Sequence, residues 1–161
     1  NLVYLDSQIF EILTARRILS SDSLKLVETY RRKWGLDQYD ALIQTSLISD
    51  EELKVVLAEQ LKLPVVDSTD QLQLDKDCLK FVDFKDAKRW WSIPAAYITE
   101  GKSQALVLIM SDPTSEELRA EISKKVGANL RLSLATRQEI RTAIYREYPL
   151  EQQLPKTFMK K

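Results

Sequence analysis

The residues best suited to binding chemistry are clusters of basic and aromatic side chains. Arg16-Arg17 and Arg31-Arg32-Lys33 lie in the first half of the chain, and guanidinium groups bind phosphates and carboxylates through paired hydrogen bonds. Trp90-Trp91 follows Lys88-Arg89, and an indole ring beside cations suits stacking on a nucleobase. Each cluster also has a structural interpretation, as a solvated helix face or as core packing. These residue types indicate recognition rather than catalysis.

The composition argues against a catalytic centre. The chain has no histidine, one cysteine and three glycines, so it lacks the commonest general base and metal ligand and has no glycine-rich phosphate loop. Glu51-Glu52 and Glu116-Glu117 lie in the first turns of expected helices, where the helix dipole accounts for them without acid–base chemistry. We therefore expect a protein that is not an enzyme, with no catalytic residues and no metal.

Length and charge fit part of a larger protein. The 161 residues, 24 of them basic and 24 acidic, suit one domain or two small ones of roughly 60 and 90 residues. The zero net charge argues against nucleic-acid binding. Cys78 has no partner for an intrachain disulfide, which fits a reducing cytoplasm. Because the chain begins at Asn1, we expect a fragment, and its apolar runs are too short to span a bilayer.

A repeated helix–cap–helix unit organises the first half of the chain. The step of 29 residues from Leu13 to Leu42 recurs from Ser20 to Ser49, so that residues 12–31 resemble residues 41–60. We expect helices near 7–18, 20–33, 37–45 and 49–63. Ser20 and Ser49 should be N-caps and Gly35 a C-cap. The constant offset indicates a true duplication.

The second half is predicted to be a small sheet packed with helices, in the order β-α-β-β-α-β-α. The predicted elements are a strand at Val65-Val66, a short helix at 77–84, a hairpin of Trp90–Thr99 and 104–110 around Gly101, a helix at 115–126, a strand at 130–134 and a helix that begins after Thr136. The fold class is therefore α+β. We assign residues 1–66 to a helical tandem-repeat subdomain, 67–149 to an α/β sandwich subdomain and 150–161 to a tail, with a seam at 67–75.

Several short motifs follow one another in a definite order. They are Ile93-Pro94, Leu106–Met110, Asp112-Pro113, Gly127, Leu130–Leu134 and Thr136–Ile144, preceded by Leu47–Gln60 and Leu63–Asp67. This order resembles the N-terminal domain of type II secretion and type IV pilus assembly ATPases, over residues 8–147. The same domain is also found attached to membrane glycosyltransferases and other bacterial envelope proteins.

The resemblance implies a non-catalytic regulatory or docking domain of a bacterial secretion or pilus assembly ATPase-type protein. An exposed face of the helical repeat would bind a cytoplasmic segment of an inner-membrane protein, or the rest of its own chain. The domain would be cytoplasmic and peripheral to the inner membrane, without nucleic-acid binding or direct membrane insertion. In this family the ATPase core follows the domain, so hydrolysis would lie outside the present residues.

One branch of the family resembles a cyclic di-GMP receptor, which leaves a cyclic di-GMP-sensing module of a glycosyltransferase or envelope protein as the alternative. That branch opens each motif with Arg-Leu-Gly and has a glycine before the second helix. The matching positions here are Gln8-Ile9-Phe10 with Arg17, and Asp37-Gln38-Tyr39 with Ser46. Because the arginines and glycines are replaced, we expect no cofactor. The residues that the resemblance leaves for ligand contact are Gln60, Arg17 and Arg31.

Overall fold

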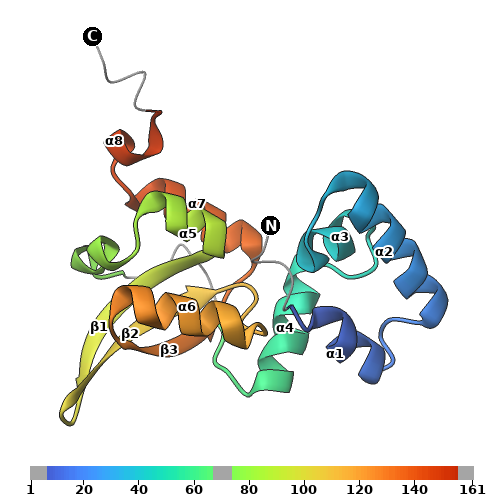
Figure 1. Cartoon of the computed structure of the whole chain (residues 1–161), viewed down its shortest axis with the longest axis horizontal. Coiled ribbons are helices and arrows are strands. Elements are labelled where there is room, and N and C mark those ends of the chain that lie inside the picture. Colours follow the sequence, from blue (N-terminus) through green and yellow to red (C-terminus); the bar gives the residue numbers. More distant parts are fainter. Residues whose placement is uncertain (1–6, 67–73, 156–161) are drawn as a thin grey trace.

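The computed structural model describes residues 7–66 and 74–155, and it is an α+β structure with two hydrophobic clusters (Figure 1). The helical half consists of α1 (Ile9–Ala15), α2 (Ser21–Trp34), α3 (Gln38–Gln44) and α4 (Asp50–Leu61). The second half consists of η3 (Lys76–Phe81, a 3₁₀ helix), α5 (Phe84–Trp90), β1 (Ser92–Glu100), β2 (Ser103–Met110), α6 (Glu116–Val126), β3 (Asn129–Leu134), α7 (Arg137–Glu147) and α8 (Leu150–Gln153). The predicted fold class is confirmed.

The predicted helix caps explain where the helices begin and end. The Ser20 and Ser49 side chains accept hydrogen bonds from the third residues of α2 and α4, and Ser49 and Thr136 form full capping boxes. Gly35 ends α2 in the left-handed conformation, with φ 65°, which glycine adopts without steric cost. These local signals are independent of tertiary packing, so the sequence alone predicts them well.

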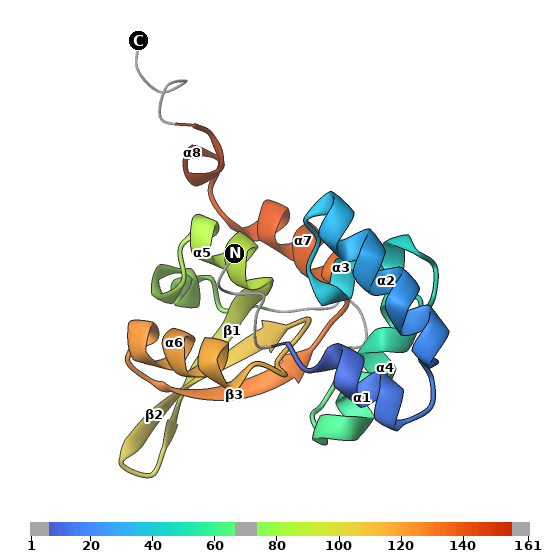
Figure 2. The ribbon, with the colours of Figure 1, turned by 45° about the vertical axis from the view of Figure 1, so that its right-hand side comes forward.

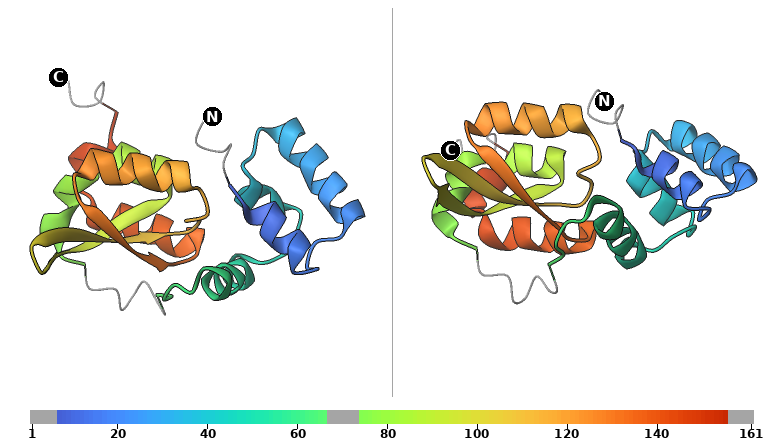
Figure 3. Two further views of the ribbon diagram at one scale, coloured as in Figure 1. Left: turned by 60° about the horizontal axis from the view of Figure 1, so that its bottom comes forward. Right: turned by 90° about the horizontal axis from the view of Figure 1, so that it is seen from below.

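The sheet has the order β1-β2-β3, with β1 antiparallel to β2 and β2 parallel to β3. The crossover from β2 to β3 runs through α6, and α6 and α7 lie on opposite sides of the strands (Figure 3). Apolar residues of β2, such as Leu106 and Leu108, are fully buried because both faces of the sheet are covered. The predicted strand at Val65-Val66 is a single parallel bridge between Val65 and Leu134.

The two hydrophobic clusters meet at β3. Leu134, the last residue of β3, packs within the cluster of the helical half. Its backbone also pairs with the segment after α4, since the Val66 N–H donates to the Leu134 carbonyl at 2.8 Å. Helix α4 accordingly lies beside the end of β3 (Figure 2). Backbone hydrogen bonds and apolar packing therefore both connect the helical half to the α/β half.

Some predicted elements are wrong in type or extent. Trp90 was predicted to open a strand, but it ends helix α5, and β1 begins at Ser92. Asp83 starts α5 by capping the backbone N–H of Asp86, a signal that the aromatic pair obscured. The helix predicted at 77–84 is the 3₁₀ helix η3, and the tail contains α8. The predicted seam lies mostly outside the described residues, which resume at Leu74.

Among the helices that the structure describes, none combines the length and the hydropathy that a membrane span requires.

Candidate functional site

The two repeats have the same backbone course. Helices α1 and α3 begin and end at residues related by the 29-residue step. The turns after them share hydrogen bonds, because the Arg17 N–H donates to Thr14 and the Ser46 N–H donates to Ile43. Arg17 and Ser46 both adopt a left-handed conformation, with φ 62° and 61°. The predicted duplication is therefore confirmed, and both positions hold a residue with a Cβ where glycine would be less strained.

Two of the residues predicted to contact a ligand lie at one junction. Arg17 is exposed in the turn after α1, and Gln60 is exposed in the last turn of α4. Their chain neighbours form the contact there, since the Arg16 guanidinium lies 3.0 Å from the Glu59 carboxylate. Arg16 also donates to the Val56 carbonyl at 3.3 Å. A ligand that reached Arg17 and Gln60 would therefore lie beside an ion pair that already occupies Arg16.

The third predicted residue, Arg31, is partly buried on α2 rather than at that junction. Its guanidinium lies 3.4 Å from Glu28, one turn earlier on the same helix. Its Nε atom is buried without a hydrogen-bond partner. Among the described residues, no hydrogen bond or ion pair joins Arg31 to Arg17 or Gln60, so a shared role of the three in ligand contact stays a prediction.

Bulky side chains fill the positions that glycine holds in the cyclic di-GMP-binding branch. Phe10 and Tyr39, which replace the last glycine of each Arg-Leu-Gly opening, have only 5% and 1% of their surface exposed. Both belong to the core of the helical half. Glycine at such a place permits a ligand to approach the backbone, whereas a buried ring excludes it. These two rings weaken the case for a dinucleotide at the start of either motif.

An arginine from the α/β half packs against the start of the second motif. The Arg137 guanidinium makes two contacts with the Asp37 carboxylate, at 2.9 Å and 2.8 Å. It also lies 2.9 Å from Asp40 and stacks between the rings of Tyr39 and Trp91, 4.3 Å and 4.6 Å from their centroids. Burial by itself lowers the pKa of Arg137, but the carboxylates of Asp37 and Asp40 outweigh it and raise that pKa. Arg137 is therefore a charged connection between the halves.

Asp50 makes the second polar connection across the same boundary. Its carboxylate accepts hydrogen bonds from the backbone N–H groups of Arg137 and Gln138, each at 3.1 Å, at the N-terminus of α7. The Tyr39 hydroxyl also donates to Asp50. Burial, and then the Asp50 charge, raise the pKa of the Tyr39 hydroxyl. Asp50 thus serves two helices, since it lies in the first turn of α4 and also caps α7.

Sequence reasoning missed both Arg137 and Asp50. One signal was present for Arg137, because a basic residue in the first turn of a helix opposes the helix dipole unless an acidic partner compensates it. Asp50 lies in the first turn of α4, where its place in the sequence indicates only a contact with the dipole of its own helix. The cavity beside Arg137, lined in part by Trp90 and Ser111, has a volume of about 30 Å³. That volume holds a water molecule and excludes a dinucleotide.

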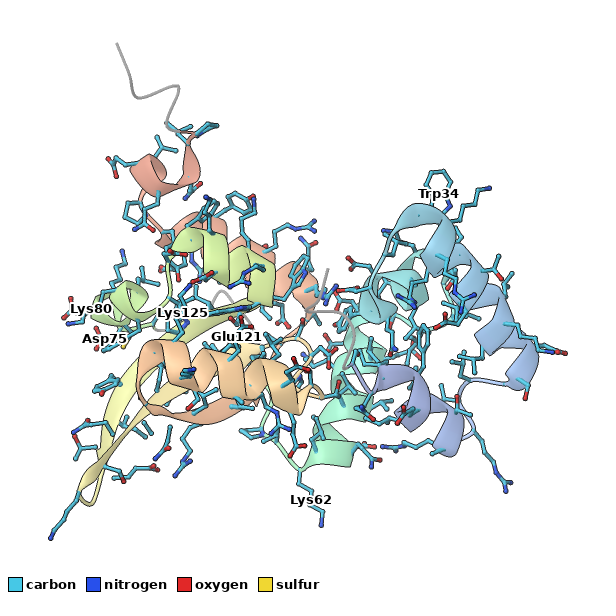
Figure 4. The ribbon with its side chains drawn as sticks, in the orientation of Figure 1. Trp34, Lys62, Asp75, Lys80, Glu121 and Lys125 are labelled. Carbon is cyan, nitrogen blue, oxygen red and sulfur yellow. The ribbon has the colours of Figure 1, made fainter. Side chains whose placement is uncertain are left out.

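One side of α2 carries large apolar side chains outside both hydrophobic cores. Leu26, Tyr30 and Trp34 recur every four residues and therefore share this side, which we call the outer face of α2. Leu26 and Trp34 have 61% and 60% of their surface exposed, and Trp34 projects away from the molecule (Figure 4). The rings of Tyr30 and Trp34 are 6.3 Å apart, with the Lys33 ammonium 5.5 Å from the Trp34 ring.

Comparison with known proteins gives one family and several similar folds. The model of a family described as "MshEN domain" matches residues 61–154. A structure of MshE with cdg (cyclic di-GMP) aligns with a TM-score of 0.66 and 22% identity, over 87% of this chain and 98% of that one. Two crystal forms of the XpsE N-terminal domain align with TM-scores of 0.61 and 0.58 at 24% identity, over 88% of this chain and 94% and 95% of theirs. Identities this low show a shared fold. No curated protein proved similar.

Proposed function

Because the chain belongs to the MshEN domain family, we propose that it is the non-catalytic regulatory or docking domain of a bacterial secretion or pilus assembly ATPase-type protein. In this proposal it binds a cytoplasmic segment of an inner-membrane partner through the outer face of α2. The N-terminal domain of XpsE has a similar fold, which supports a role ahead of an ATPase core. We also propose that the parent protein hydrolyses nucleotide in a part outside these residues. The domain would then lie in the cytoplasm, peripheral to the inner membrane.

The observation that carries the proposal is the outer face of α2, where Leu26 and Trp34 are exposed and Tyr30 between them is half-buried. Tryptophan and tyrosine are the residues that most often dominate the energy of protein interfaces. Helix α2 packs on the core through Val27, which is completely buried, and the side chains of Leu26 and Trp34 are left exposed beside it. An exposed tryptophan on a short amphipathic helix therefore favours contact with another protein over a purely structural role.

The charge of α2 defines the chemistry of the partner. The helix carries four basic residues and two acidic ones, and its last turn ends in Arg31-Arg32-Lys33. A complementary segment would present apolar side chains to Leu26 and Trp34 and carboxylates to the basic last turn. We therefore expect an acidic, amphipathic segment rather than a basic one.

Calorimetric titration tests the docking proposal. The cytoplasmic segments of the inner-membrane proteins of the parent system would be produced one at a time and titrated into the full chain. We expect one of them to bind, and Trp34→Ala to weaken that binding about tenfold or more. Leu150→Asp is the matched control, since Leu150 is 64% exposed but lies on α8. Binding that Trp34→Ala leaves unchanged would contradict the assignment to α2.

A cyclic di-GMP-sensing module of a glycosyltransferase or other envelope protein is the second candidate. The similarity to the MshE fold solved with cdg supports it, whereas the buried rings of Phe10 and Tyr39 count against it. Titration of cyclic di-GMP separates the two. We expect no heat of binding from the chain, and saturable binding that Arg17→Ala abolishes would favour sensing instead.

A further inference from the structure

A pocket with aromatic and cationic walls lies between α5 and α7, which run side by side in the α/β half (Figure 1). We call it the α5–α7 pocket. Its volume is about 260 Å³, and it is lined by Lys88, Trp91, Arg141, Ile144 and Tyr145. No residue of α2 contributes to it, so whatever it binds is independent of docking on the outer face of that helix.

The two cations of this pocket contact aromatic rings. Lys88 lies over the rings of Phe84 and Tyr145, 5.1 Å and 5.9 Å from their centroids, and Arg141 lies 5.3 Å from that of Trp91. Within residues 7–66 and 74–155, neither has a carboxylate within 4.0 Å. Arg89, the next residue on α5, has Asp86 at 3.0 Å. Positive charge is therefore left uncompensated at the pocket, which favours an anionic ligand.

The backbone at Trp91, the C-cap of α5, sets the position of one wall of the pocket. Trp91 has φ 47° and ψ 57°, a left-handed conformation that a bulky side chain rarely adopts. Helices often end in this conformation, and α4 does so at Lys62 with φ 56°. This backbone holds the indole ring between Arg137 and Arg141, so that it forms one wall of the pocket.

A second aromatic wall is open to solvent. Tyr145 has 48% of its surface exposed, although its ring packs edge-on against Phe84 at 5.6 Å. Aromatic side chains beside cations are the combination that holds a flat ring and its phosphate together. The volume is slightly below the range of about 300 to 1,000 Å³ that is usual for drug-sized ligands. The pocket therefore suits one ring with one anionic group.

From these features we propose that the α5–α7 pocket binds a small aromatic anion of the nucleoside monophosphate class. Lys88 and Arg141 pair with the phosphate, and the rings of Trp91 and Tyr145 contact the base. Neither the exposed cations nor Tyr145 is needed for the core, so their replacement tests binding without loss of the fold.

Titration of AMP into the full chain, by calorimetry and tryptophan fluorescence, tests this site. We expect saturable binding, with adenosine and inorganic phosphate each weaker by about tenfold or more, because each keeps only one half of the recognition. The Lys88→Gln/Arg141→Gln double variant should bind AMP about tenfold more weakly or worse. Lys85→Gln is the matched control, an exposed lysine of the same helix that does not line the pocket, and it should bind as the unchanged chain does.

Several results would overturn the proposal. An absence of saturable AMP binding would remove the site. Phosphate that binds as tightly as AMP would remove the role of the rings, and adenosine that binds as tightly would remove the role of the cations. AMP binding that survives in both the double variant and Tyr145→Ala would show that the nucleotide binds elsewhere. None of these results depends on whether α2 binds a partner.

Discussion

Arg137 forms a bidentate ion pair with Asp37, and the pair joins the first turn of α7 to the cap of α3 across the boundary between the two halves. Both side chains are about one-tenth exposed. In the cyclic di-GMP-binding branch the position of Asp37 holds an arginine. The charge at position 37 is therefore negative instead of positive, and the Arg137 guanidinium of the same chain pairs with it. The second motif thus serves to hold the two halves together.

Loss of Arg137 should destabilise the protein strongly. Arg137→Met leaves two carboxylates without their cation, and we expect the free energy of unfolding to fall by about 3 kcal/mol, as is usual when one partner of a buried ion pair is removed. Urea unfolding measures the change. Arg131→Gln is the control, because the ion pair of Arg131 with Glu100 is largely exposed and should contribute less than about 1 kcal/mol. Equal effects from the two substitutions would contradict the central role of Arg137.

Glycine at Ser46 should stabilise the chain. Ser46 has φ 61°, which costs an L-residue about 1–2 kcal/mol, while glycine adds about 0.4–1 kcal/mol of entropy to the unfolded chain. We expect a net gain of about 0.5 kcal/mol for Ser46→Gly in chemical denaturation. Ser46→Ala keeps the Cβ and is the control, with no comparable gain expected. A destabilised glycine variant would show that the Ser46 side chain makes a contact of its own.

Asp50 should matter more than an ordinary first-turn acid. Asp50→Ala removes the acceptor for two backbone N–H groups of α7, so we expect a loss of about 1–2 kcal/mol, as for other helix caps. Asp22→Ala is the comparison, because Asp22 lies in the first turn of α2 and is exposed. That substitution should cost about 0.5 kcal/mol through the helix dipole alone. Thermal unfolding of both variants distinguishes the two roles.

Asp86 gives the protein a dependence on acidic pH. Burial raises the pKa of this carboxyl, but Lys125 and Arg89, at 2.5 Å and 3.0 Å, outweigh burial and hold the pKa below its ordinary value of 3.8. A lowered folded-state pKa gives stability that is present above the ordinary pKa and is lost as the pH falls through the folded value. The difference in urea midpoint between the unchanged chain and Asp86→Asn should therefore be constant at neutral pH and shrink below about pH 4. A constant difference down to the lowest pH would contradict this shift.

Local signals made most of the fold predictable. The 29-residue repeat, the serine caps of α2 and α4 and the glycine that ends α2 depend only on neighbouring residues, and the structure confirms them. Trp90 is an exception, because its residue type predicts the wrong element. Its aromatic side chain suits a strand, but the cap at Asp83 and burial against the sheet make it the end of α5. A local cap and tertiary packing together override the strand preference of the aromatic side chain.

The candidate site was less predictable, because its contacts link residues far apart in the sequence. Asp37 was recognised as a departure from the motif, but its partner Arg137 lies 100 residues later. The family motif points to Gln60 and Arg31, and no hydrogen bond joins them in the described part of the chain. The exposure of the outer face of α2 was not predictable from the sequence either. Periodicity does not tell which apolar side of a short helix remains uncovered.

Docking through α2 can be tested by hydrogen–deuterium exchange of the full chain with and without the inner-membrane segment that binds in the titrations. Exchange reports local opening, which slows where a partner covers a helix. If the segment binds on α2, we expect slower exchange across Leu26–Trp34, with exchange in α5, α6 and α7 unchanged. Slower exchange in the α/β half, with α2 unaffected, would contradict the claim that this domain docks through α2.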